Sequence, residues 1–278
     1  MNGLWRRPPP SRGPVWSRAR VSMLLVAIAA FVVLMVTGLG LTVRVAVGSR
    51  DISATHAPAA KPPVTASQVS DAQRRDALAA APMLAVSAED SRSGDPAVSP
   101  APSISIPDAT LVGAARVPSG FPRTPEGAVG QLAAIEVVVL QAMSVPRTVE
   151  VHRAWADPAV EPAADWRLTA HVRSFLQAAR MGGQKDLTTT VTVAPVAAQV
   201  KATDGPDWVI ACVLVDVRAV IATEQRMAYG YCERMQWTGR RWTIAPGTPP
   251  AEAPSTWPDT DLAAAAGWQT WRNGRGGS

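Results

Sequence analysis

The chain has few of the residues that mark metal centres, disulfide scaffolds and nucleophilic catalysis. Two cysteines in 278 residues exclude a disulfide-dense miniprotein. The three histidines, His56, His152 and His171, show no metal-ligand spacing and no carboxylate four residues away, which argues against zinc. No glycine-rich phosphate loop, G-x-S-x-G elbow or recognisable Cys–His frame occurs in the sequence. The sequence therefore predicts no catalytic residue, no metal and no cofactor.

Excess positive charge is confined to one end of the chain. The formal net charge is +5, and residues 1–50 hold seven basic and no acidic side chains. Residues 51–110 hold four basic and seven acidic side chains, and residues 111–278 hold sixteen and fifteen. A nearly neutral C-terminal part has no electrostatic footprint for DNA or RNA. We therefore expect no direct nucleic-acid partner.

Only one apolar run is long enough to cross a membrane, which excludes a multi-span transporter. Residues 21–43 carry no charge, and at ~1.5 Å per residue they span the ~30 Å hydrocarbon core of a bilayer. A basic tail, residues 1–20, precedes this run and indicates a cytoplasmic N-terminus, so the rest of the chain is expected outside the cytoplasm at the cell membrane. Its topology-setting arginines are Arg6, Arg7, Arg12, Arg18 and Arg20.

A cleaved signal peptide is the alternative to this anchor. Small residues at Ala46-Val47-Gly48 suit signal peptidase. A signal-peptide core is usually only ~7–15 residues long, so the length of the run favours a retained single-pass helix. A twin-arginine export signal is disfavoured, because three prolines and no apolar run follow Arg6-Arg7.

Residues 44–110 are rich in alanine, proline and serine and poor in large apolar side chains. Little apolar surface is available to offset the entropy lost on ordering, so we expect a disordered linker. From Ser70 to Ala81, an N-cap candidate precedes an alanine-rich run, which predicts a short, marginal helix. The composition suits a tether across a periplasm or cell wall, and it is equally common in GC-rich genomes without functional cause.

Apolar periodicity begins at residue 111 and predicts one extracytoplasmic domain over residues 111–272. Thr124-Pro125 has the N-cap and first-position proline of a helix, and Gly182-Gly183 is a helix stop. After these glycines the apolar period changes from helical to two. The expected helices span residues 125–143, 146–156 and 162–181, and the expected strands span residues 187–202, 208–222, 225–237 and 241–245.

The order of helices followed by strands predicts an α+β fold rather than a parallel βαβ sheet. We expect one N-terminal transmembrane helix, a disordered linker, and a cone-like domain of three helices followed by a four-stranded antiparallel curved sheet. A short helix is expected at residues 261–266. Residues 273–278 are expected to fray.

The two cysteines test the strand register. A hairpin centred near Ala222 places Cys212 opposite Cys232, and it also places Val215 opposite Tyr229. A domain outside the cytoplasm lies in an oxidising environment, so we predict a disulfide between Cys212 and Cys232. Two buried free thiols remain the alternative if the orientation is reversed.

Two further groups of side chains are candidate sites. Trp257, Trp268 and Trp271 crowd the C-terminal tail, and large aromatics seldom stay solvated, so the tail packs on the domain or binds a partner. Asp216 and Arg218, with Arg234 on the next strand, either line a concave pocket or form a cross-strand charge pair on a solvated face, and the second reading is favoured. A weak enzyme that uses Asp216 or Tyr229 is the remaining alternative.

Three segments carry a resemblance to known proteins: GFPRTPEGAVGQLAAI at 120–135, ATEQRMAYGYCERM at 222–235, and RWTIAPG with STWPDTDLAAAAGW within 241–268. With the overall layout, they make residues 115–272 resemble bitopic proteins with nuclear-transport-factor-like domains. The resemblance is strongest to anchored assembly proteins of conjugative elements in high-GC Gram-positive bacteria, of the TcpC type and the type IV secretion scaffold subunit. The chain departs from the TcpC type in having one such domain instead of two.

The resemblance implies a non-enzymatic membrane-anchored scaffold of a conjugation or type IV secretion machine. Its partners would be other membrane or secretion-complex proteins, and a homo-oligomer is compatible with it. A membrane protein that accompanies lipid-import operons and holds a small apolar ligand in its cone is the alternative.

Overall fold

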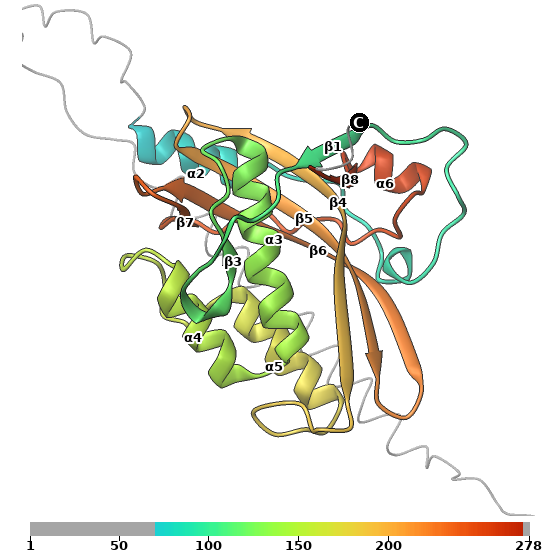
Figure 1. The fold of residues 1–278 in the computed structure, drawn as a ribbon. Coiled ribbons are helices and arrows are strands. Elements are labelled where there is room, and N and C mark those ends of the chain that lie inside the picture. The colour runs from blue at the N-terminus through green and yellow to red at the C-terminus, as the bar shows by residue number, and fades with distance from the viewer. Residues whose placement is uncertain (1–69, 275–278) are drawn as a thin grey trace, which may run out of the picture. The chain divides into compact units, whose positions relative to one another are not determined.

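Residues 70–274 of the computed structural model are described here, and they are built on a six-stranded sheet in the order β1-β8-β4-β5-β6-β7 (Figure 1). A separate two-stranded sheet joins β2 and β3. The strands are β1 Ser103–Ile106, β2 Leu111–Val112, β3 Pro118–Ser119, β4 Thr190–Thr203, β5 Trp208–Val220, β6 Glu224–Trp237, β7 Trp242–Ile244 and β8 Gln269–Asn273. The helices are α2 Asp71–Ala80, α3 Pro125–Ala142, α4 Val145–Trp155, α5 Arg167–Ala178 and α6 Asp261–Ala265, with 3-10 turns η1 Glu89–Ser91 and η2 Ala114–Arg116.

The predicted four-stranded antiparallel sheet with three helices is wrong. β1 and β8 extend the sheet, and they pair in parallel, with Ser103 opposite Thr270, so the sheet is mixed. β8 also pairs antiparallel with β4 through Ala197 and Ala198. The prediction of a disordered linker over 44–110 fails for its second half, because α2 and β1 are ordered parts of the domain.

The predicted basic tail, the membrane helix at residues 21–43, the first part of the linker and the last four residues lie outside the described residues. The five topology-setting arginines lie there too. Within residues 70–274, no helix combines the length and the apolar character needed to cross a membrane.

The predicted hairpin register is present. β5 and β6 pair without a shift from Trp208 opposite Gln236 to Val220 opposite Glu224, and this register places Val215 opposite Tyr229. Thr124 caps α3 by accepting a hydrogen bond from the Gly127 amide at 3.1 Å. α5 begins five residues later than predicted, because residues 163–165 form a turn before it.

One face of the sheet packs against α3, α4 and α5. Val213, Val215 and Val217 of β5 belong to the same buried cluster as Leu132 and Ile135 of α3. In Figure 1, α3 lies along this face, and the β5–β6 hairpin projects beyond it. This face carries most of the apolar core.

The opposite face of the sheet is buried as well. Ile210, Cys212 and Leu214 pack in a second cluster with Ala79 of α2 and Trp268 of the tail. β5 is therefore buried on both sides along almost its whole length, which explains its nearly unbroken apolar sequence. The N-terminal segment and the C-terminal tail together form the cover on this side.

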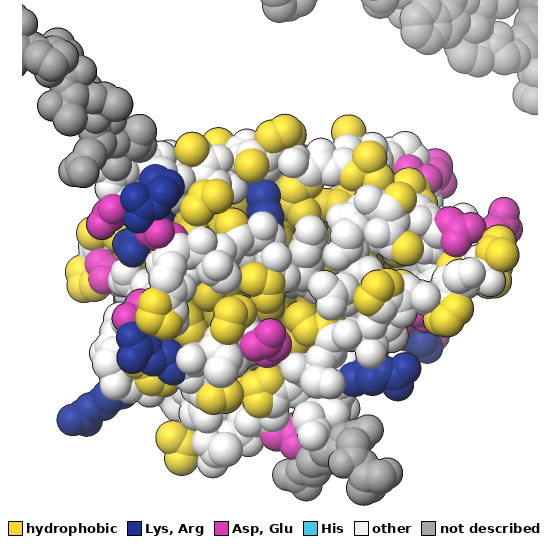
Figure 2. All heavy atoms as spheres, turned by 90° about the horizontal axis from the view of Figure 1, so that it is seen from above, with side chains coloured by type: hydrophobic (Ala, Val, Ile, Leu, Met, Phe, Trp, Pro, Cys, Tyr) yellow, Lys and Arg dark blue, Asp and Glu magenta, His cyan; other side chains and the backbone are white. Residues whose placement is uncertain are grey.

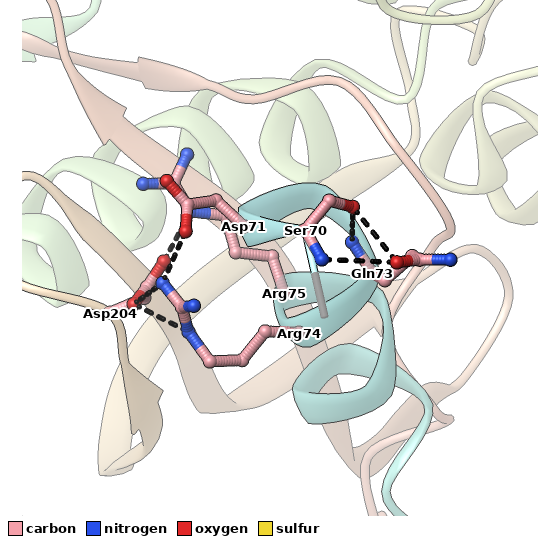
Figure 3. A network of polar contacts seen from close by, with 6 residues as sticks. All are labelled: Ser70, Asp71, Gln73, Arg74, Arg75 and Asp204. Carbon is pink, nitrogen blue, oxygen red and sulfur yellow. Dashed lines mark hydrogen bonds and ion pairs between the residues drawn. The ribbon is translucent and has the colours of Figure 1, made fainter. Parts of the chain in front are cut away.

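α2 is the predicted short helix, and polar contacts dock it on the domain. Ser70 and Gln73 form a capping box at its N-terminus. Arg74 and Arg75 both donate hydrogen bonds to the carboxylate of Asp204, which lies between β4 and β5 (Figure 3). These bonds, with that from Arg75 contributing most, hold the pKa of Asp204 below its usual value. A helix that is marginal alone is thus stabilised by its contacts.

The C-terminal end of α2 is also held. Lys201 Nζ of β4 donates to the carbonyls of Ala79 and Ala81 at 2.8 and 2.6 Å, which satisfies orphan carbonyl groups at the helix end. Arg234 of β6, only 3 % exposed, pairs with Asp76 of the helix.

Surface charge is mixed in sign. In Figure 2, the basic side chains of the visible face lie mostly toward its sides, often beside acidic ones, and uncharged side chains fill much of its middle. That face carries no broad basic patch of the kind that binds a nucleic-acid backbone.

Candidate functional site

An apolar pocket of about 610 Å³ opens between α5 and the outer part of the β5–β6 hairpin. We call it the Phe175 pocket. Its size falls within the range of small-ligand sites, ~300–1,000 Å³. The side chains that line it are Arg92, Leu140, Met143, His171, Ser174, Phe175, Val217, Ala219, Gln225, Arg226, Met227 and Tyr229.

His171 and Tyr229 form a polar contact in the wall of the pocket. The Tyr229 hydroxyl and Nδ1 of His171 share a hydrogen bond, and the rings meet edge to face at 5.4 Å. Burial, reinforced by Arg167, lowers the pKa of His171, and burial raises the pKa of Tyr229 well above its usual value. The imidazole is therefore neutral at pH 7 and Tyr229 keeps its proton, and the hydroxyl donates the shared hydrogen bond in the tautomer that carries the ring proton on Nε2.

A second buried polar group lies farther along β6. The Glu233 carboxylate accepts hydrogen bonds from Tyr231 Oη at 2.6 Å and from Trp166 Nε1 at 3.1 Å. Burial raises the pKa of Glu233 despite these bonds. Arg167 lies over the Tyr231 ring at 5.3 Å and donates to the Cys232 carbonyl. These contacts give the buried Glu233 carboxylate and the Trp166 indole N–H hydrogen-bond partners in the core.

Glu136 of α3 is the least satisfied group in the described part of the chain. Its side chain is fully buried, and neither carboxylate oxygen has a hydrogen-bond partner among residues 70–274. Burial raises the pKa of Glu136 well above its usual value, which favours the protonated side chain. Glu136 lies one helical turn from Leu140, which lines the Phe175 pocket. A buried carboxyl without a hydrogen-bond partner lowers the stability of the fold.

The charged residues predicted to share a pocket occupy two separate places. Asp216 accepts hydrogen bonds from Arg218 at 3.2 Å and Arg226 at 2.7 Å. Burial raises the pKa of Asp216, but these two bonds outweigh it and leave the pKa below its usual value. Arg234 instead pairs with Asp76 and lies over the Trp208 ring at 5.3 Å. The first group is a cross-strand charge cluster, and the second docks α2.

The three tail tryptophans differ in environment. Trp268 is 2 % exposed and donates a hydrogen bond to the Pro254 carbonyl at 2.9 Å. Trp257 and Trp271 are half-buried, and the guanidinium of Arg226 lies over the Trp257 ring at 4.5 Å. The tail therefore packs on the domain, and none of these three side chains lines the Phe175 pocket.

The predicted disulfide between Cys212 and Cys232 is present, with the two Cα atoms 4.1 Å apart. Both cysteines are buried, and the Met83 sulfur lies 3.6 Å from the Cys232 sulfur. This bond staples β5 to β6 on the face covered by α2 and the tail.

Sequence reasoning missed the Phe175 pocket and the buried glutamates. Glu136 lies on the helix stripe that includes Leu132 and Leu140, so an acidic residue on an apolar stripe was the available signal. Tyr229 and Glu233 lie on the face of β6 that packs on the helices. The two-residue alternation of side chains along the strand therefore also indicated that they are buried.

The chain matches no protein-family model, no curated protein and no solved structure.

Proposed function

We propose that the chain is a non-enzymatic, membrane-anchored assembly component that binds another protein chain at the end of the domain where the β5–β6 hairpin projects. The observation that carries this proposal is the apolar surface at that end. Val220, Ile221 and Met227 are 40 %, 47 % and 42 % exposed. Met227 also lines the Phe175 pocket, so one of these exposed apolar side chains is also a pocket residue. Such surfaces typically mark protein contacts.

Two features support a role outside the cytoplasm and without catalysis. A buried disulfide is typical of oxidising compartments, in agreement with the anchor expected at residues 21–43. The alternative catalytic groups are poorly suited to reaction: Tyr229 holds its proton, and Asp216 is neutralised by two arginines. The partners suggested by the sequence resemblance are components of a conjugation or type IV secretion machine.

Site-specific photo-crosslinking tests this proposal. A photoreactive residue replaces Ile221 in the full-length chain in its native membrane, and Val112, 78 % exposed on the separate two-stranded sheet, serves as the matched control. We expect protein adducts at position 221 at least about fivefold more abundant than at 112, because an apolar docking surface is covered in the assembled state. Equal adducts at both positions, or none at 221, contradict the proposal.

A small apolar ligand is a second candidate, favoured by the size and lining of the Phe175 pocket. In that case the full-length chain, released gently from membranes, retains a lipid-sized mass in native mass spectrometry. Ser174→Trp, which fills the pocket, should abolish this mass, and Gln177→Trp on the exposed surface of α5 should keep it. A chain that carries no additional mass rules out the ligand.

A further inference from the structure

The outer edge of β6 is covered over most of its length. β7 pairs with residues Met235 to Trp237, and the Gly230 amide donates to Ser255 Oγ at 3.0 Å. The tail lies so close that a side chain at Gly230 would meet the Pro254 carbonyl oxygen at 2.8 Å. From Glu224 to Met227, however, the side chains are exposed, and no strand of the described domain pairs with this edge.

This short edge is protected by its length and by the charges of Glu224 and Arg226, and it contains no proline and no bulge. The β4 strand carries Pro195 and register shifts beside it and at Val200, whereas β5 and β6 pair without a shift. The Gly230 amide points away from β5. The backbone N–H and C=O groups of every second residue toward the hairpin tip therefore also point outward, including those of Glu224 and Arg226. The Glu224 carbonyl accepts a hydrogen bond from the Gln225 side-chain amide at 3.0 Å, an exposed contact that an incoming strand would replace.

We infer that the occupant of this edge is the β6 edge of a second copy of the chain, paired antiparallel about a two-fold axis at Gln225. This inference names the partner of the proposed assembly function and rests on that function. An axis at Arg226 would place two arginines opposite each other, and one at Met227 would direct Glu224 toward the occupied Gly230 amide. An axis at Gln225 places Glu224 of each copy opposite Arg226 of the other, in a pair whose backbone groups all point outward.

The charges of this edge suit the pairing. Arg226 donates through Nε to Asp216 and lies over Trp257, so its guanidinium is held in place. Among the described residues, its Nη groups donate no hydrogen bond and Glu224 belongs to no ion pair. Each copy therefore offers one carboxylate and one ordered guanidinium to the other, which is the complementarity that a two-fold interface requires.

This register is confined to the start of β6. Residues 221–223 form the turn that joins β5 to β6, so only Glu224, Gln225 and Arg226 of each copy lie opposite strand residues of the other. The two Glu224–Arg226 pairs on either side of the axis therefore set the register.

Cysteine crosslinking of the full-length chain in its native membrane tests the register. Opposed residues at the axis have Cα atoms about 4.5 Å apart, within disulfide reach, so Gln225→Cys should give a covalent dimer. In the control, Met227→Cys, position 227 of one copy lies roughly 14 Å from position 227 of the other, beyond disulfide reach. This variant should give at least about tenfold less dimer. No dimer from Gln225→Cys, or equal yields from both variants, overturns the inference.

A charge variant checks the orientation of the pair. Glu224→Lys in the Gln225→Cys background sets lysine against Arg226 at two symmetric positions and should lower dimer yield about tenfold. An unchanged yield contradicts the register. If Ile221 forms photo-adducts only with a different protein and Gln225→Cys gives no dimer, the assembly function stands and the self-pairing falls.

Discussion

Removing the disulfide should lower the stability of the domain by about 3 kcal/mol, since the bond closes a loop of 20 residues in the unfolded chain. For a domain of this size the loss corresponds to a fall in Tm of roughly 6–12 °C. Cys212→Ala combined with Cys232→Ala provides the change, and near-ultraviolet circular dichroism of the full-length chain provides the measurement.

Reductant supplies the control for this experiment. The double variant should show the same Tm with and without dithiothreitol. The wild-type Tm should fall only once the disulfide has been reduced, and reduction requires the domain to open because both sulfurs are buried beside Met83. A wild-type chain whose Tm is unaffected after full reduction and alkylation would show that the bond contributes no stability.

Replacing Glu136 with leucine should stabilise the domain at pH 7 by about 1–3 kcal/mol, because a buried polar group without a partner is exchanged for an apolar one of similar size. The gain depends on pH. The unfolded chain releases the Glu136 proton above roughly pH 4.3, and the folded chain retains it because burial raises the pKa. Between the pKa of Glu136 in the unfolded chain and its higher pKa in the folded chain, the native state binds more protons than the unfolded state. This group therefore lowers stability as pH rises through that range.

Tm measured at pH 4 and pH 7 provides the test. The advantage of Glu136→Leu should be larger at pH 7, and Glu150→Leu on the exposed surface of α4 should change stability by less than about 0.5 kcal/mol at either pH. A loss of stability in Glu136→Leu at pH 7 would mean that the carboxyl has a bound partner in the assembled protein.

The elements that sequence reasoning located are those with strong local signals. α3 follows an N-cap threonine and a proline, and the β5–β6 register follows from the alternation around Ala222. These signals act over short sequence distances. They are sufficient to place Cys212 opposite Cys232.

The missed features depend on contacts between distant segments. β1 is only four residues long in a stretch rich in proline and serine, and its parallel partner lies more than 160 residues away. α2 is docked by Asp204 and Lys201, neither of which its own sequence reveals. The Phe175 pocket likewise combines α3, α5 and both strands of the hairpin, so no local pattern outlines it.

The position of β8 has a consequence for the synthesis of the protein. β8 is the last strand of the described residues, yet it lies between β1 and β4 and is the neighbour through which β1 joins the sheet. β1 therefore has no strand partner until β8 is made, and before then Ile104 and Ile106 have only the α3 side of the core to pack against. Because such long-range pairing is slow, the final folding step awaits the release of residue 273 from the ribosome or export channel. A chain truncated before Gln269 would leave this sheet permanently open.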